Sequence, residues 1–193
     1  MPIQVKDIDK HILSNGWAPL HRIDFSFQFK NKEWKRVSRE VYNRKDAACV
    51  LLYNPERNCV ILTKQFRMPA YLNTKEEGMS IEVCAGLIDE GESPLEAVLR
   101  ETEEEVGYRV PKAKKIMEIY LSPGAITEKT YLFIAEYTTD MKVNAGGGLE
   151  SENEEIEVLE LPFDDVLQLL QTNVIKDAKT VILLQYLKSQ SAF

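Results

Sequence analysis

The stretch "GLIDEGESPLEAVLRETEEEVGY", from Gly86 to Tyr108, contains the helix that decides how this chain folds. Ser93 can cap a helix, Pro94 suits its first turn, and Glu96 completes a capping box. Gly107 supplies a stop at the C-terminal end. The spacing therefore predicts a helix between these two signals, with one apolar stripe that docks on a sheet. The stripe consists of Leu95, Val98, Leu99, Thr102 and Val106.

The last turn of this helix is crowded with acid: it holds Glu101, Glu103, Glu104 and Glu105. The helix dipole disfavours anions at this end, so the cluster of acids needs an explanation. One alternative is that the acids form a solvated surface face with no chemical role. At about 100° per residue, Glu101, Glu104 and Glu105 share one arc beside the docked edge. Glu103 lies across the stripe, and we interpret it as a surface charge without a chemical role. One Arg100 cannot neutralise four acids, so a divalent cation is expected, and oxygen ligands favour Mg2+ or Mn2+.

Composition places the chain among folded proteins with no general affinity for polyanions. It has 193 residues, 44% hydrophobic and 28% charged, which suits one domain with at most a small appendage. The net charge of -7 and a pI near 5.1 argue against binding to nucleic acid or anionic membranes. The sequence shows neither a membrane-spanning apolar run nor a signal peptide. Cys49, Cys59 and Cys84 are expected to be reduced core thiols of a cytoplasmic protein.

Apolar runs on either side of the helix predict a mixed sheet. "AACVLLY" (47–53) and "CVILTKQF" (59–66) are typical of buried strands joined by a turn. Further strands are predicted at 79–86, 114–122, 129–137 and 154–161, and amphipathic helices at 162–172 and 178–190. Because strands and helices do not alternate strictly, the fold class is α+β, a sandwich with one helix in the middle of the chain.

The N-terminal segment predicts a hairpin with an aromatic face. Ile23, Phe25, Phe27 and Phe29 alternate along 22–29, and "WKRVSREVY" (34–42) follows a short turn. A hairpin alone cannot bury such a face, so we expect it to pack on the main body or on a second chain.

The spacing of the helix stretch resembles the signature of the Nudix hydrolases. Gly86, five residues, Glu92, seven residues and then Arg100 to Tyr108, "RETEEEVGY", match the family pattern at every defined position. The resemblance implies a Nudix-type α/β/α sandwich over 44–193, preceded by an N-terminal strand and hairpin segment over 1–43 involved in dimerisation. It also implies Mg2+-dependent hydrolysis of a nucleoside diphosphate linked to another moiety, with Mn2+ as a substitute.

By position, the resemblance also assigns the metal and catalytic residues. Glu101, Glu105, Glu154 and the carbonyl of Ala85 are the expected metal ligands, with Glu104 near them. Glu105, Glu154 and Arg100 are the expected catalytic residues, Arg100 by orienting the carboxylates.

The loop that carries Glu154 has its own sequence features. Gly146, Gly147 and Gly148 read as a hinge that could swing an acid over the metal. The acids that follow are Glu150, Glu152, Glu154 and Glu155. Glu154 is the first choice for the base, the register among the last three stays open, and the alternative is a mobile acidic surface loop.

Segments outside the box are similar to the branch of the family that acts on nucleotide sugars. "LSPGAITEKT", with Ser122, Pro123 and Gly124, indicates this branch, and "SREVYNR", "KQFRMPAYLN" and "NAGGG" favour bacterial members acting on GDP-mannose. The implied reaction gives GMP and mannose 1-phosphate. ADP-ribose or another ADP-sugar is the alternative substrate. A non-catalytic sensing module is the alternative class, and the intact box argues against it.

The resemblance implies a substrate site built from several segments, with Arg67 on the phosphates. Its residues are Trp17, Ser38, Arg39, Glu40, Arg67, Ala85, Gly86, Leu87, Glu105, Glu128, Asn153, Glu154 and Lys179. The hairpin residues are expected to act across a homodimer, the partner's hairpin completing the site. For Lys179, an ordinary exposed lysine is the alternative.

Overall fold

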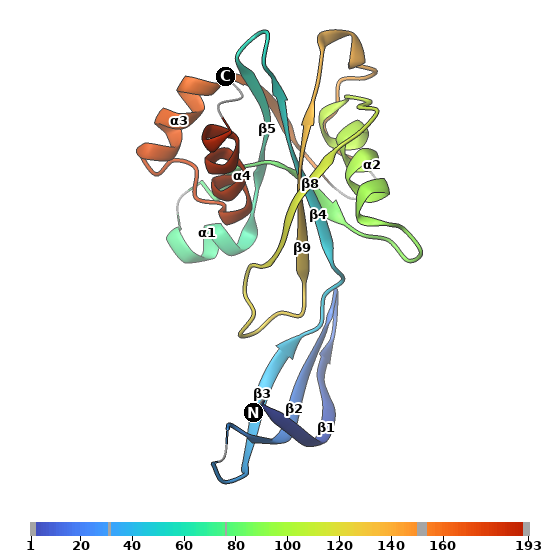
Figure 1. The fold of residues 1–193 in the computed structure, drawn as a ribbon, viewed down its shortest axis with the longest axis vertical. Helices are drawn as coiled ribbons and strands as arrows, with labels where there is room; N and C mark the ends of the chain where they lie inside the picture. Colours follow the sequence, from blue (N-terminus) through green and yellow to red (C-terminus); the bar gives the residue numbers. More distant parts are fainter. Residues whose placement is uncertain (1–2, 31, 76, 150–153, 191–193) are drawn as a thin grey trace. The chain divides into compact units, whose positions relative to one another are not determined.

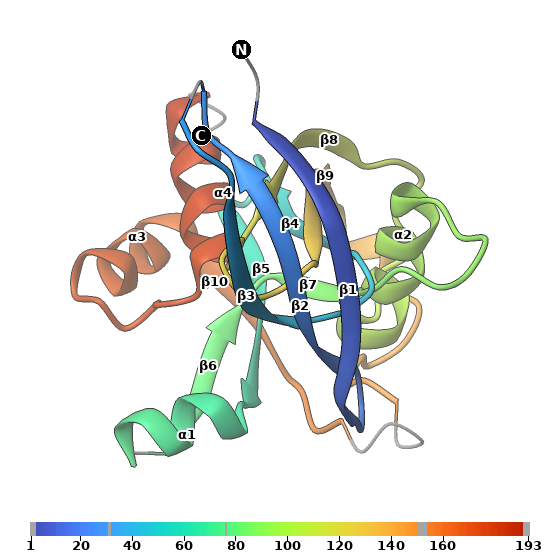
Figure 2. The same cartoon turned by 90° about the horizontal axis from the view of Figure 1, so that it is seen from below.

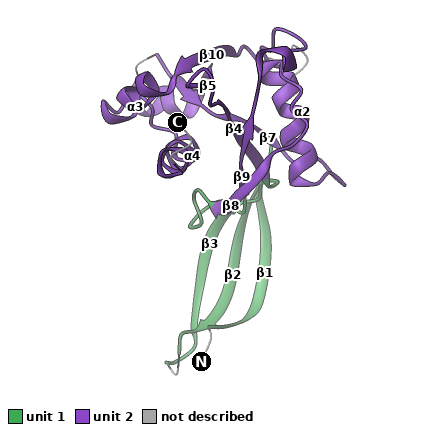
Figure 3. Ribbon diagram, turned by 45° about the horizontal axis from the view of Figure 1, so that its top comes forward, with its two compact units in different colours: residues 1–46, 120–129 green, residues 47–119, 130–193 purple. Residues whose placement is uncertain are grey.

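A computed structural model describes residues 3–30, 32–75, 77–149 and 154–190. The chain forms two compact units, drawn in different colours in Figure 3. One unit comprises residues 1–46 and 120–129, and the other residues 47–119 and 130–193. The segment 120–129 joins the first unit because its backbone pairs with Tyr42, which donates to Ala125 O and accepts from Thr127 N. No helix in the described ranges is long and apolar enough to cross a membrane.

The second unit is built on a mixed sheet. Its described strands follow the order β10-β5-β4-β9-β8, with β6 paired to β5 and β7 paired to β4. The bounds are β4 Ala47–Asn54, β5 Cys59–Phe66, β8 Lys114–Tyr120, β9 Lys129–Glu136 and β10 Glu157–Pro162. β4 and β9 are parallel, whereas β4–β5 and β5–β10 are antiparallel.

Helices cover both faces of this sheet. Figure 1 shows α2 on one side and α3 and α4 on the other. The bounds are α2 Pro94–Val106, α3 Phe163–Gln171 and α4 Ala178–Ser189. A short 3-10 helix spans Thr139–Met141. The layers confirm the predicted α/β/α sandwich.

Strand β4 shows why both faces are covered, because all its central residues are apolar. Ala48, Val50 and Leu52 belong to the core cluster on the α2 side. Cys49 and Leu51 belong to the cluster with α3 and α4. Successive side chains of a strand point to opposite faces, so a continuous apolar run requires two cores.

The helix at the centre of the sequence argument forms as predicted. Ser93 accepts from Glu96 N in a complete capping box, and Gly107 ends the helix with a left-handed φ of 78°. The expected stripe was partly wrong, because Leu95 is 42% exposed while Glu105 is only 2% exposed. The face of the helix that packs on the sheet is therefore shifted from the expected stripe toward the acidic residues. Glu105 lies within the buried face, not beside it.

The strand predicted at 79–86 is two strands. β6 (Met79–Glu82) pairs with β5, and β7 (Cys84–Leu87) pairs with β4. At the break, Val83 N donates to Thr180 Oγ1 at 2.8 Å, so a side chain from α4 replaces a ladder partner. A sequence pattern that is apolar throughout cannot reveal such a change of neighbour.

One short helix was not predicted. α1 (Met68–Thr74) begins directly after Arg67 with a proline in its first turn, and Lys75 ends it in the left-handed region. It buries none of its residues, so no apolar periodicity marks it in the sequence.

The first unit is a three-stranded antiparallel sheet in its described part, with the order β1-β2-β3 (Figure 2). The predicted hairpin is confirmed as β2 (Pro19–Gln28) and β3 (Lys35–Tyr42). The family resemblance implies an N-terminal strand, but the residue pattern did not locate β1 (Gln4–Asn15). Every residue of β1 is exposed, so it lacks the one-sided apolar alternation that indicates a half-buried strand.

Candidate active site

Arg100 gathers the acids at the end of α2. Its Nη1 donates to Glu101 Oε1 at 2.7 Å and to Glu104 Oε2 at 2.9 Å. Its Nε and Nη2 donate to the two oxygens of Glu92 at 3.0 and 3.1 Å. Nη2 also donates to Leu87 O at 3.2 Å, which ties the helix to the end of β7. One guanidinium thus binds three carboxylates and fixes their orientation.

Glu105 occupies the most buried position of this cluster. Its Oε2 accepts a hydrogen bond from Ala85 N at 3.0 Å, and the thiol of Cys84 lies against the same carboxylate. Burial raises the pKa of Glu105 to about 8, with a further contribution from the negative charge of Glu101. Burial likewise raises the pKa of Glu101 to about 7. Like charges are held together here at the expense of their ionisation.

These residues fit a divalent cation by their chemistry. Carboxylate and carbonyl oxygens are the donors that Mg2+ and Mn2+ prefer. Burial raises the pKa of Glu101 and of Glu105, and neighbouring carboxylates raise both further, so a bound cation would favour the ionised forms. Gly86 leaves room for the carboxylate of Glu101: a Cβ at that position would lie 1.8 Å from Glu101 Oε1. In the described ranges no three acidic, histidine or cysteine side chains already converge on one point.

The glycine loop is bonded to the end of α2. Gly147 N donates to Glu105 O at 2.8 Å and Gly148 N to Glu104 O at 3.2 Å, so the loop caps the helix. Glu154 folds back on this loop, where its Oε2 accepts from Leu149 N at 3.3 Å. The negative charge of Glu154 contributes to the raised pKa of Glu101 and of Glu105, so the structure brings Glu154 to the acidic cluster. Glu150, Glu152 and Asn153 lie outside the described residues.

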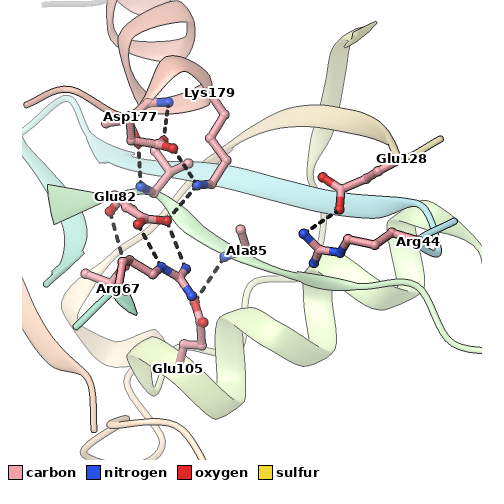
Figure 4. A network of polar contacts seen from close by, with 11 residues as sticks. Arg44, Arg67, Glu82, Ala85, Glu105, Glu128, Asp177 and Lys179 are labelled. Atoms are coloured by element: carbon pink, nitrogen blue, oxygen red, sulfur yellow. Dashed lines mark hydrogen bonds and ion pairs between the residues drawn. The ribbon is translucent and has the colours of Figure 1, made fainter. Parts of the chain in front are cut away.

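Arg67 belongs to a partly buried ionic network (Figure 4). Its Nε and Nη2 donate to the two oxygens of Glu82 at 2.9 and 3.0 Å. Lys179 Nζ donates to Glu82 Oε2 at 2.6 Å and to Asp177 Oδ1 at 2.8 Å. Although burial alone would raise it, Arg67 and Lys179 lower the pKa of Glu82 to about 2. Lys179 is only 9% exposed, so its interpretation as an ordinary exposed lysine was wrong.

In the first unit, Arg44 links two of the predicted substrate contacts, Trp17 and Glu128. Its guanidinium lies 4.5 Å from the centroid of the Trp17 ring, and its Nη1 lies 3.1 Å from Glu128 Oε2. Figure 4 shows the Arg44–Glu128 pair. Trp17 keeps 72% of its surface exposed, which leaves ring area for stacking. Ser38, Arg39 and Glu40 are all exposed on β3.

Glu103 has a separate role from its neighbours. Both of its oxygens accept from Arg109, at 2.6 and 2.8 Å, in a pair on the surface. The pair agrees with the interpretation of Glu103 as a surface charge.

Sequence reasoning missed several residues of these sites. The missed residues are the partners of predicted ones. Glu82 pairs with Arg67 and Lys179, and Asp177 pairs with Lys179. Arg44 contacts Trp17 and Glu128, and Cys84 contacts Glu105. A carboxylate inside the apolar run "SIEVCAG" was the one available signal for Glu82, since a buried charge requires a partner. The partners come from distant segments, which no local pattern reveals.

Comparison with known proteins covers nearly the whole chain. The family model described as "NUDIX domain" matches residues 43–184. A second, described as "GDP-mannose pyrophosphatase NudK N-terminal domain", matches residues 4–42. A GDP-mannose pyrophosphatase of Cronobacter sakazakii is 47% identical over 188 residues, 97% of both chains. Proteins of the same name from Pectobacterium atrosepticum and Escherichia coli O139:H28 are 45% and 44% identical, covering 96% and 98% of this chain and 93% and 97% of their own.

Proposed function

Because this chain belongs to the Nudix family, we propose that it is a pyrophosphohydrolase that converts GDP-mannose and water into GMP and mannose 1-phosphate. The proposal is supported by relatives of that name that align over both units of the chain. The observation that carries it is the geometry at the end of α2, where Arg100 orients the carboxylates beside a buried Glu105.

Nudix hydrolases generally use divalent metal ions, and we assign Mg2+ here, with Mn2+ as a substitute. Glu101, Glu105, Glu154 and the carbonyl of Ala85 would hold it. When bound, the ion supplies positive charge for the diphosphate and acidifies a water molecule. The assignment is supported by the oxygen-only donor set, and by the burial and the neighbouring negative charges that raise the pKa values of Glu101 and Glu105.

The side chains of the chain have distinct tasks in this scheme. Arg100 fixes the orientation of Glu101 and Glu104, and Ala85 N fixes that of Glu105. Glu154 accepts the proton of the attacking water. This role is supported by its place on the loop that closes on the end of α2.

The substrate contacts that we propose are those implied by the family resemblance. Arg67 binds the diphosphate, and the loop residues Gly86 and Leu87 line the same part of the site next to the metal ligands. Lys179 contributes positive charge behind Arg67. Trp17, Ser38, Arg39 and Glu40 contact the nucleotide. Glu128 and Asn153 complete the substrate contacts, and Asn153 lies outside the described residues.

We further propose that the protein is a cytoplasmic homodimer in which residues 1–43 of the partner complete the site. The dimer is supported by the apolar side chains that β1 and its flanks leave in solvent. These are Ile3, Val5, Ile8, Ile12 and Leu13, each at least 47% exposed. So many exposed apolar side chains on one strand are typical of an interface. The location is supported by the free thiols of Cys49, Cys59 and Cys84, which suit a reducing compartment.

Turnover with Mg2+ on GDP-mannose, ADP-ribose and GDP-glucose tests the function directly. We expect the highest kcat/KM for GDP-mannose, and equal or higher values for ADP-ribose would replace it with an ADP-sugar substrate. Products formed in 18O-labelled water identify the attacked phosphorus. Unchanged turnover after Glu101→Gln or Glu105→Gln would refute the site, and light scattering in solution tests the dimer.

A further inference from the structure

The contacts around Arg67 fix the orientation of its guanidinium group. Arg67 uses only Nε and Nη2 on Glu82, and the described residues supply no hydrogen bond to its Nη1. Two bonds in the fork geometry fix the plane of a guanidinium. The carboxylate of Glu82 therefore sets the direction in which the remaining N–H groups of Arg67 point.

Glu82 is itself clamped from the other side. Lys179 Nζ donates to the same oxygen, Oε2, that accepts from Arg67 Nη2. The backbone around Glu82 is held too, since Thr63 Oγ1 donates to Glu82 O at 3.2 Å. Only 4% of Glu82 is exposed, so water cannot substitute for these partners.

The clamp begins at the first turn of α4. Asp177 Oδ2 accepts from Thr180 N at 3.0 Å and from Thr180 Oγ1 at 2.6 Å, while Oδ1 accepts from Lys179. Thr180 Oγ1 in turn accepts from Val83 N. The N-terminus of α4 is thus joined to Glu82, the last residue of β6, and to Val83 at the break between β6 and β7.

We propose that Glu82 is a positioning residue for the hydrolytic reaction: held by Lys179 and the Asp177–Thr180 cap, it orients Arg67 so that its unused donors meet the substrate diphosphate. This inference rests on the proposed function for the identity of the substrate. It changes the role of Lys179, which acts through Glu82. It also explains why the charges of Glu82 and Lys179 are buried here, although buried ion pairs seldom add net stability.

The test is a double-mutant cycle on Arg67→Lys and Glu82→Gln with GDP-mannose and Mg2+. Glu82→Gln keeps the shape of the side chain but loses the bidentate ion pair with Arg67. Arg67→Lys keeps the positive charge but cannot form a bidentate pair. We expect each single variant to lose about 10- to 100-fold in kcat/KM, with KM rising more than kcat falls. The double variant should lose little more than either single variant, because both changes remove one interaction. Glu103→Gln, which breaks the exposed bidentate pair with Arg109, is the matched control and should leave kcat/KM unchanged.

Multiplicative losses, or a Glu82→Gln variant within about twofold of wild type, would overturn the proposal. If Glu82→Gln does not fold, Glu82→Gln/Lys179→Met removes both charges together and should show the same rise in KM. If this variant also unfolds, Glu82 serves folding alone and the proposal is overturned. If wild-type protein cleaves no nucleotide sugar, the proposed function fails, but the positioning role can still be tested. Calorimetry then measures the affinity of the same variants for GDP, and the single and double variants are compared as before.

Discussion

Adding one methyl group at Gly86 should lower the activity of this protein strongly while lowering its stability only slightly. In the structure, a Cβ at Gly86 would lie 1.8 Å from Glu101 Oε1 and 2.0 Å from its Cδ. The backbone of Gly86 is not in the left-handed region, so Gly86→Ala introduces no backbone strain. The obstructing atoms are the end of a flexible side chain, which can move aside.

The size of that movement sets the expected effect. To reach the 3.4 Å of ordinary contact, Glu101 Oε1 must retreat by about 1.6 Å. That displacement breaks its 2.7 Å bond with Arg100, a loss of about 1 kcal/mol of stability and so a fall of about 2–4 °C in Tm. A reactive group misplaced by more than about 1 Å costs about 100-fold in rate, so activity should fall far more than stability.

The measurement pairs thermal melting with Mg2+-dependent release of GMP from GDP-mannose. Gly124→Ala is the control, because a Cβ there has no atom within 4 Å. We expect a folded Gly86→Ala protein with about 1% of wild-type kcat/KM, and a control close to wild type. Wild-type activity in Gly86→Ala would refute the placement of Glu101 at the reacting centre.

Three further predictions concern stability. Because the pKa values of Glu101 and Glu105 are raised to about 7 and about 8, metal-free stability should fall as the pH rises through these values. The rise in Tm on adding Mg2+ should therefore be larger at about pH 9 than at about pH 6, and an equal rise at both would contradict it. Ser93→Ala should cost about 1 kcal/mol in denaturant unfolding with kcat unchanged; a loss of activity without a loss of stability would disagree. Gly107→Ala should cost more than about 2 kcal/mol, since its φ is 78° and its Cβ would lie 2.3 Å from Asn144 O, and a wild-type Tm would exclude this strain.

The sequence was most informative where structure is local. Capping signals at Ser93 and Gly107 depend on neighbours within a few residues, and both were predicted correctly. The buried place of Glu105 was missed because a helical wheel gives angles within a helix, not the side that the sheet covers. Leu95 was misplaced for the same reason.

Contacts between distant segments could not be predicted from the sequence. The break at Val83 depends on Thr180, and the orientation of Arg67 depends on Glu82 and, beyond it, on Asp177. Each such contact exists because the fold brings two segments together that are separated in the sequence. A family signature identifies residues that touch the reaction more readily than those that hold them.

The bond between Lys179 and Glu82 spans 97 positions of the chain, and this gives it a consequence during synthesis. At about 5–20 residues per second, a ribosome makes Lys179 roughly 5–20 seconds after Glu82. During that interval the carboxylate of Glu82 has its nearer partner, Arg67, but neither Lys179 nor the α4 cap. The ion pair between Lys179 and Glu82 can therefore form only after α4 has been synthesised, whereas the pair between Arg67 and Glu82 needs no residue beyond β6.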